Sequence, residues 1–145
     1  MAKYRRIFLE EGGDHLEEIG RSLFDLEKEM GNTDAIDTFF RMAHSLKSMA
    51  ASLGYDSIAD LAHRMEDRLE GIRAAGRVRS QQELALLFRG LEAMEAMVAA
   101  VAREEEPPVA NDDLLRQLAE DSEGAFVPDL ESPDRVGGEP KKVRA

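Results

Sequence analysis

Two histidines stand three residues ahead of a charged side chain, in the patterns His44-x-x-Lys47 and His63-x-x-Glu66. Residues three apart lie on one face of a helix, so each pattern presents its two side chains together. Around the first pattern, large apolar residues recur at the helical period on the opposite side, which places His44 on an exposed flank beside Lys47. An imidazole held by a carboxylate through one ring nitrogen is a nucleophile toward phosphorus at the other, and a lysine can pair with phosphoryl oxygens. The patterns therefore suggest phosphoryl chemistry at the protein surface.

The same residues also fit a purely structural interpretation. A histidine in a helix is more often a solvated surface residue, and a His63–Glu66 pair alone stabilises a helix by only about 0.2–0.5 kcal/mol. His44 and Glu66 meet only if their helices are antiparallel neighbours, which a tight turn at Gly54-Tyr55 favours. In that arrangement Glu66 would fix the tautomer of His44 and stabilise the charged ring during transfer.

Four predicted helices must position these residues. Apolar residues recur at helical spacing over residues 4–30, 34–53, about 57–75 and 80–103. The first helix is expected to bury Tyr4, Ile7, Phe8, Ile19, Leu23, Leu26 and Met30. Helices of this length joined by short links predict an all-α, antiparallel up-down four-helix bundle without strands.

The ends of these helices have recognisable signals. Gly54 is expected to end the second helix in the left-handed conformation, and Asp56 or Ser57 to cap the third. Ser80 and Glu83 have the spacing of a capping box at the start of the fourth. The pair Gly12-Gly13 leaves open whether the first helix is kinked or broken.

The chain changes character after Arg103. An acidic, proline-containing stretch follows, so we expect a bundle domain over residues 1–103 and a linker over residues 104–145. Leucines at helical spacing predict a short fifth helix at 111–121, either docked on the bundle or free. Residues 122–145 have the composition of a disordered segment.

Composition excludes several classes of protein. The formal net charge of −11, of which −7 falls in residues 104–145, argues against nucleic-acid binding, which needs clustered Lys and Arg. Without cysteine, disulfides and thiolate metal sites are ruled out. No signal peptide or membrane-spanning run is present, so we expect a soluble, cytoplasmic and monomeric fragment with no direct membrane insertion.

The stretch HSLKSMAASLGY from His44 to Tyr55, followed by His63-Arg64-Met65-Glu66, resembles the histidine phosphotransfer (Hpt) domain at the N-terminus of chemotaxis histidine kinases of the CheA family. The resemblance extends back through residues 8–11 and 23–27 and forward to about residue 103. It therefore covers the whole predicted bundle. In that family a linker and further domains follow, so the chain resembles a fragment of a longer protein.

The resemblance implies a role for each residue of the pattern. The histidine at position 44 would take a phosphoryl group from ATP and pass it to an aspartate of a response regulator. Lys47 would assist the transfer, while His63 and Glu66 would form the hydrogen-bonding surround of His44. Gly54 matches the family's turn glycine, and Ser48 replaces the usual glycine with another small residue that preserves access to the ring.

The implied partners are an ATP-binding kinase domain and the receiver domains of response regulators. The chain has no Gly-rich phosphate loop and no room for an ATP-binding domain, so ATP and Mg would be handled by that separate kinase domain and no cofactor by the bundle.

Three other interpretations remain open. A stand-alone phosphorelay protein would share the same residues. An inert helical adaptor would leave His44 merely exposed. A di-metal carboxylate bundle would need Glu-x-x-His on two helices, and only Asp60-x-x-His63 comes close, so we expect no metal site.

Overall fold

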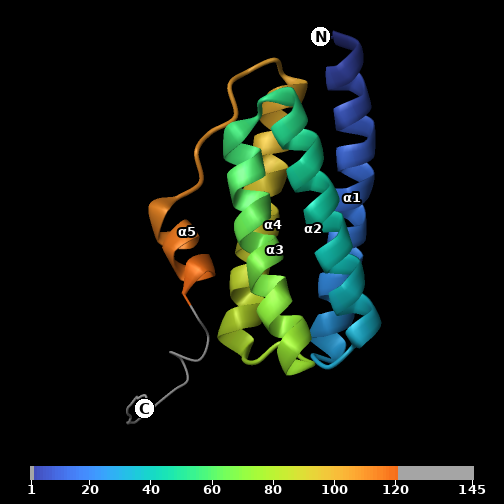
Figure 1. Cartoon of the computed structure of the whole chain (residues 1–145), viewed down its shortest axis with the longest axis vertical. Coiled ribbons are helices and arrows are strands. Elements are labelled where there is room, and N and C mark those ends of the chain that lie inside the picture. Colours follow the sequence, from blue (N-terminus) through green and yellow to red (C-terminus); the bar gives the residue numbers. More distant parts are fainter. Residues whose placement is uncertain (1, 121–145) are drawn as a thin grey trace.

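The structure is a computed structural model that describes residues 2–120, and within that range it contains helices and no strands. The helices are α1 (Ala2–Lys28), α2 (Thr33–Leu53), α3 (Asp56–Ala75), α4 (Gln81–Ala102) and the short α5 (Asp112–Ala119). The first four run alternately up and down and pack in a ring in which each contacts its two neighbours (Figure 1). The predicted fold class is therefore confirmed, and the prediction of disorder over residues 122–145 lies outside the described residues.

The core fills the space between the four long helices. Its largest fully buried side chains are Phe8, Ile19, Leu23, Leu26, Ile36, Phe39, Leu46, Ile58, Leu61, Met65 and Leu69. The prediction that Tyr4 and Ile7 face this core is wrong, because they are 55% and 36% exposed. The first turn of α1, which contains Tyr4, extends past the end of the bundle (Figure 1), whereas Ile7 lies roughly 100° around the helix from the buried Phe8.

Helix α1 is continuous across its glycine pair. Gly12 lies against α2, where an added Cβ would sit 3.6 Å from a methyl group of Leu46, an ordinary contact distance. Gly13 faces open space. Packing against the neighbouring helices outweighs the cost of two glycines in a helix, which is about 1 kcal/mol each relative to alanine.

Alanine at Gly13 and at Gly54 should have opposite effects on stability. Gly13 is helical and unobstructed, so Gly13→Ala should raise the free energy of unfolding by about 0.5–1 kcal/mol. Gly54 has φ +80°, so Gly54→Ala should lower it by about 1 kcal/mol despite the free space around it. Urea denaturation of both variants beside the parent measures the two shifts. A stabilising Gly54→Ala would contradict the left-handed turn.

The helix ends match most of the sequence signals, with exceptions at the starts of α3 and α4. The capping box expected at the start of α4 is only half formed, because the Glu83 carboxylate accepts from the backbone N–H of Arg79 and not from that of Ser80. The Asn32 and Ser80 side chains accept hydrogen bonds from the first turns of α2 and α4, at 3.0 Å in each case. The expected cap of α3 at Asp56 or Ser57 is wrong, because Asp56 is already helical. Tyr55 occupies the cap position without a side-chain hydrogen bond and packs its ring 5.1 Å from that of Phe8. An aromatic contact therefore takes the place of a polar cap.

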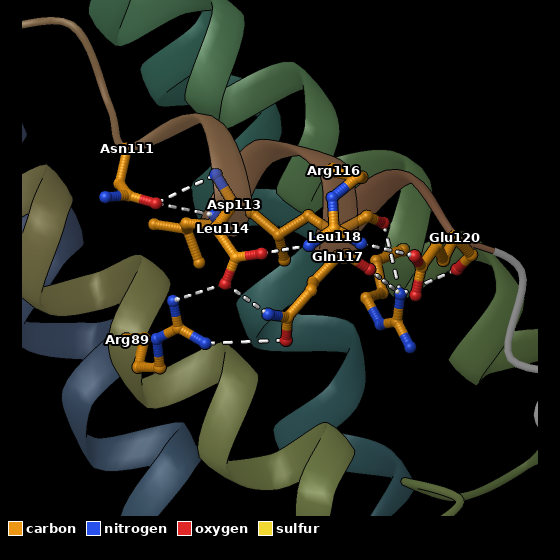
Figure 2. Close-up of polar contacts among 9 residues, drawn as sticks. Arg89, Asn111, Asp113, Leu114, Arg116, Gln117, Leu118 and Glu120 are labelled. Atoms are coloured by element: carbon orange, nitrogen blue, oxygen red, sulfur yellow. Dashed lines mark hydrogen bonds and ion pairs between the residues drawn. The ribbon is translucent and has the colours of Figure 1, made fainter.

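Helix α5 docks on α3 and α4 (Figure 1). Its Leu114 and Leu118 side chains are buried. Asn111 caps its N-terminus, and polar contacts connect Asp113, Gln117 and Arg89 (Figure 2). An isolated helix of eight residues is not stable in water. Its order therefore comes from this docking.

None of the helices within residues 2–120 is long and apolar enough to cross a membrane.

Candidate functional site

The site begins with a contact between His44 on α2 and Glu66 on α3. The ring Nδ1 of His44 lies 2.5 Å from Oε2 of Glu66. An ionised carboxylate only accepts hydrogen bonds, so Nδ1 carries the proton and donates it to Glu66. The side chain of His44 is 56% exposed, whereas that of Glu66 is 11% exposed. Whenever the ring is neutral, this hydrogen bond leaves the lone pair on Nε2, the ring nitrogen that does not contact Glu66.

Lys47 holds the other oxygen of the same carboxylate. Its Nζ lies 2.5 Å from Oε1 of Glu66. Burial raises the pKa of Glu66, but the hydrogen bonds and positive charges of Lys47 and His44 outweigh it and hold the pKa below its ordinary value. Glu66 is consequently ionised near neutral pH and remains an acceptor for His44.

The chain brings these side chains together through the turn between α2 and α3. Gly54 adopts the left-handed conformation, and its backbone N–H returns to the carbonyls of Ala50 and Ala51 at the end of α2. The reversal makes α2 and α3 antiparallel neighbours. His44 and Lys47 share one face of α2 because they are three residues apart, and that face opposes Glu66.

His63 does not join this cluster, which corrects the expectation that it surrounds His44. Its Nε2 lies 3.4 Å from Oδ2 of Asp67, one turn further along α3, and its side chain is 55% exposed. Among the hydrogen bonds of residues 2–120, none joins His63 to His44. Sequence reasoning missed Asp67, although its four-residue spacing from His63 was a signal for a pair within the helix.

The two remaining predicted residues have the expected surroundings. Ser48 is exposed on α2, one turn after His44, so its small side chain leaves the ring accessible. Gly54 lies in the turn. Within the part of the chain that the structure describes, no group of three or more histidine or carboxylate side chains could hold a metal ion.

A four-helix bundle that carries an imidazole on its surface, held through one nitrogen by a carboxylate, has the architecture of a helical phosphotransfer module. The family model of the Hpt domain matches residues 3–104. The chain therefore belongs to the Hpt domain family.

Its relatives are chemotaxis proteins named CheA. The chain is 33% identical to CheA of Halobacterium salinarum over 96 residues, which are 66% of this chain and 14% of the relative. It is 34% identical to CheA of Bacillus subtilis over 101 residues, which are 70% of this chain and 15% of the relative. The chain thus spans only about a seventh of the length of these relatives, and it is a CheA-like Hpt phosphotransfer domain.

Two solved structures share the fold. The solution structure of the histidine phosphotransfer domain of CheA superposes with a TM-score of 0.75 at 25% identity, covering 93% of this chain and 99% of that one. The phosphorylated P1 domain of CheA3 from R. sphaeroides, solved in complex with CheY6, superposes with a TM-score of 0.71. That second comparison covers 81% of this chain and 94% of the other at 21% identity, and it bears on the fold alone.

Proposed function

We propose that His44 is the phosphoacceptor of a chemotaxis-type histidine kinase. The observation that carries the proposal is the arrangement of its ring, with Nδ1 tied to a buried carboxylate and Nε2 free at the surface. A nucleophile must meet a bulky donor and later a bulky acceptor. An exposed nitrogen on a rigid helix suits both encounters.

In the first step, Nε2 of His44 attacks the γ-phosphorus of ATP. The new Nε2–P bond forms as the bond from phosphorus to the bridging oxygen of ADP breaks, and ADP leaves with that electron pair. The ring then carries a positive charge with both nitrogens substituted. Glu66 stabilises that charge through the Nδ1–H hydrogen bond, because its lowered pKa keeps it ionised.

In the second step, a carboxylate oxygen of a receiver aspartate attacks the same phosphorus. The P–Nε2 bond breaks and its electron pair returns to the ring as the lone pair of the neutral tautomer. Lys47 lies one turn from His44 and can reach the phosphoryl oxygens while it remains close to Glu66. Ser48 leaves space for the incoming domain.

The kinase activity belongs to another domain in this proposal. ATP and Mg would bind an ATP-binding domain of the parent chain, and the chain itself would bind no cofactor and catalyse nothing without it. The match to a seventh of the CheA relatives supports a parent with further domains. A receiver domain of a response regulator would be the acceptor. We accordingly assign the phosphotransfer unit to residues 1–103 and the linker to residues 104–145.

Labelling of the chain tests this function. With γ-labelled ATP and the kinase core of a CheA protein, the chain should acquire label that is stable in base and lost in acid, as expected for phosphohistidine. Addition of a CheY-type receiver should then remove the label. If a kinase core that is active on its own substrate leaves this chain unlabelled, the chain is an inert helical adaptor.

A further inference from the structure

A second cluster of side chains lies between α2 and α3 and is not part of the site described above. Nε of Arg73 on α3 lies 3.2 Å from Oδ1 of Asp37 on α2. The same guanidinium lies over the ring of Phe40, 4.4 Å from its centroid. One α3 side chain therefore contacts two α2 residues that are three positions apart.

This cluster repeats the geometry of the site at a distance of seven residues. Asp37 and Phe40 precede His44 and Lys47 by seven positions, and Arg73 follows Glu66 by seven. Because α2 and α3 are antiparallel, a step of seven residues back along α2 corresponds to a step of seven residues forward along α3. Both clusters therefore form in the same alignment of the two helices. They are separated by two turns, roughly 10 Å along the helix.

The signs of the charges are reversed between the two clusters. In the Arg73 cluster, α3 contributes the cation Arg73 and α2 the anion Asp37. In the site, α3 contributes the anion Glu66 and α2 the cation Lys47 together with His44. A slip of α3 by seven residues would place Arg73 against Lys47 in one direction, or Glu66 against Asp37 in the other. Like charges would then meet. The opposite arrangement of charges in the two clusters therefore disfavours the wrong registers of α3 against α2.

The position of the Arg73 cluster along the helix pair allows it to influence how α2 and α3 align at the site. His44 and Glu66 lie between the Gly54 turn, which fixes one end of the helix pair, and Arg73, which lies toward the other. The Arg73 and Asp37 side chains are 42% and 48% exposed, and exposed ion pairs contribute little to overall stability. A hydrogen bond as short as that of His44 and Glu66 is sensitive to small displacements of one helix along the other.

We propose that Arg73, acting through Asp37 and Phe40, is a positioning residue that holds α3 in the register where Glu66 keeps the proton on Nδ1 of His44. Its effect on the tautomer is independent of phosphotransfer, whereas its effect on the transfer rate rests on the proposed function. Arg73 touches neither His44 nor the phosphoryl group, so it acts only through the placement of Glu66.

The experiment compares Arg73→Ala with the parent chain by ¹⁵N NMR of labelled histidine, which distinguishes the Nδ1–H from the Nε2–H tautomer. Glu66→Ala gives the reference for a ring whose hydrogen-bond acceptor has been removed. We expect Arg73→Ala to shift the His44 signals toward that reference and to slow phosphorylation about five- to tenfold. Arg73→Lys, which keeps the charge, should restore most of both.

Arg64→Ala is the matched control, because Arg64 is on the same helix and pairs with Asp60 within that helix. It should leave the His44 signals and the labelling rate unchanged. Parent-like His44 signals in a folded Arg73→Ala variant would overturn the proposal, even if its melting temperature falls. If Arg73→Ala does not fold, Asp37→Asn decides by the same signals. A parent chain that accepts no label refutes the proposed function, while the tautomer comparison still decides the role of Arg73.

Discussion

Replacement of His44 by glutamine is expected to reduce phosphorylation of the chain to background. Glutamine occupies a similar volume, but its amide nitrogen has no free lone pair comparable to that of Nε2. The fold should persist because the His44 side chain is 56% exposed and contributes nothing to the core. The free energy of unfolding should therefore change by no more than about 0.5 kcal/mol. Labelling with γ-labelled ATP and a kinase core, beside a urea denaturation curve, measures both quantities.

The same substitution at the third histidine provides the control. His15 lies on α1, outside the contact between α2 and α3, so His15→Gln should be labelled like the parent. Label that persists in His44→Gln would move the phosphoacceptor elsewhere and refute the mechanism proposed above. Loss of label together with loss of the helical circular dichroism signal would instead require a repeat with His44→Asn.

Replacement of Glu83 by alanine is expected to lower the free energy of unfolding by about 3 kcal/mol. Its carboxylate receives hydrogen bonds from Arg68 at 3.0 Å and from the Arg79 side chain at 2.6 Å. The Glu83 and Arg68 side chains are only 2% and 8% exposed, so the variant leaves a cation buried without its anionic partner. Thermal or urea denaturation beside Glu92→Ala, an exposed change on the same helix, isolates the effect of burial. If Glu83→Ala lost no more free energy of unfolding than Glu92→Ala, this prediction would be contradicted.

Replacement of Glu83 by alanine should also destabilise α5. The Nη1 group of Arg68 donates to the backbone carbonyls of Gln117, Leu118 and Glu120, at 2.9, 3.1 and 2.8 Å. These are orphan carbonyls at the C-terminal end of α5. When Arg68 loses the anion that orients it, amide exchange in α5 should accelerate more than in the rest of the chain between residues 2 and 120.

The stabilisation from Glu83 should depend on pH in a defined direction. Burial raises its pKa, but the hydrogen bonds from Arg79 and the charges of Arg68 and Arg79 outweigh burial and hold the pKa below its ordinary value of 4.5. Between the two pKa values the unfolded chain binds more protons than the folded chain, so stability rises with pH. The difference in free energy of unfolding between the parent and Glu83→Gln should be largest above pH 4.5. It should vanish as the pH falls through the lowered pKa of Glu83 in the folded chain. If this difference in free energy of unfolding grew as the pH fell, the pKa of Glu83 would be raised by folding and not lowered.

The local features of the fold were predictable because a few neighbouring residues encode them. The helical spacing of apolar residues placed Ile19, Leu23 and Leu26 on a buried face, and the structure has them fully buried. Ser80 begins a helix because its side chain accepts a hydrogen bond from the first turn, and Gly54 ends one because its backbone is left-handed. Both reasons are contained in one turn of the chain. The helical period also predicted the exposed flank of His44, and the tight turn at Gly54 predicted the antiparallel pairing that places His44 opposite Glu66.

Only the tertiary structure decided which partner each long side chain reaches. His63 pairs with Asp67 on its own helix and not with the site, because the rotation of α3 about its axis directs Glu66 toward α2 and leaves His63 on the exposed side. Tyr4 remains exposed because no partner helix extends to cover the first turn of α1, and Ile7 because it lies roughly 100° around the helix from the buried Phe8. The contacts of Arg68 with α5 and of Arg73 with Asp37 join residues 36 or more positions apart. Spacing along the chain determines which face of a helix a residue occupies, whereas the packing of the helices determines what that face meets.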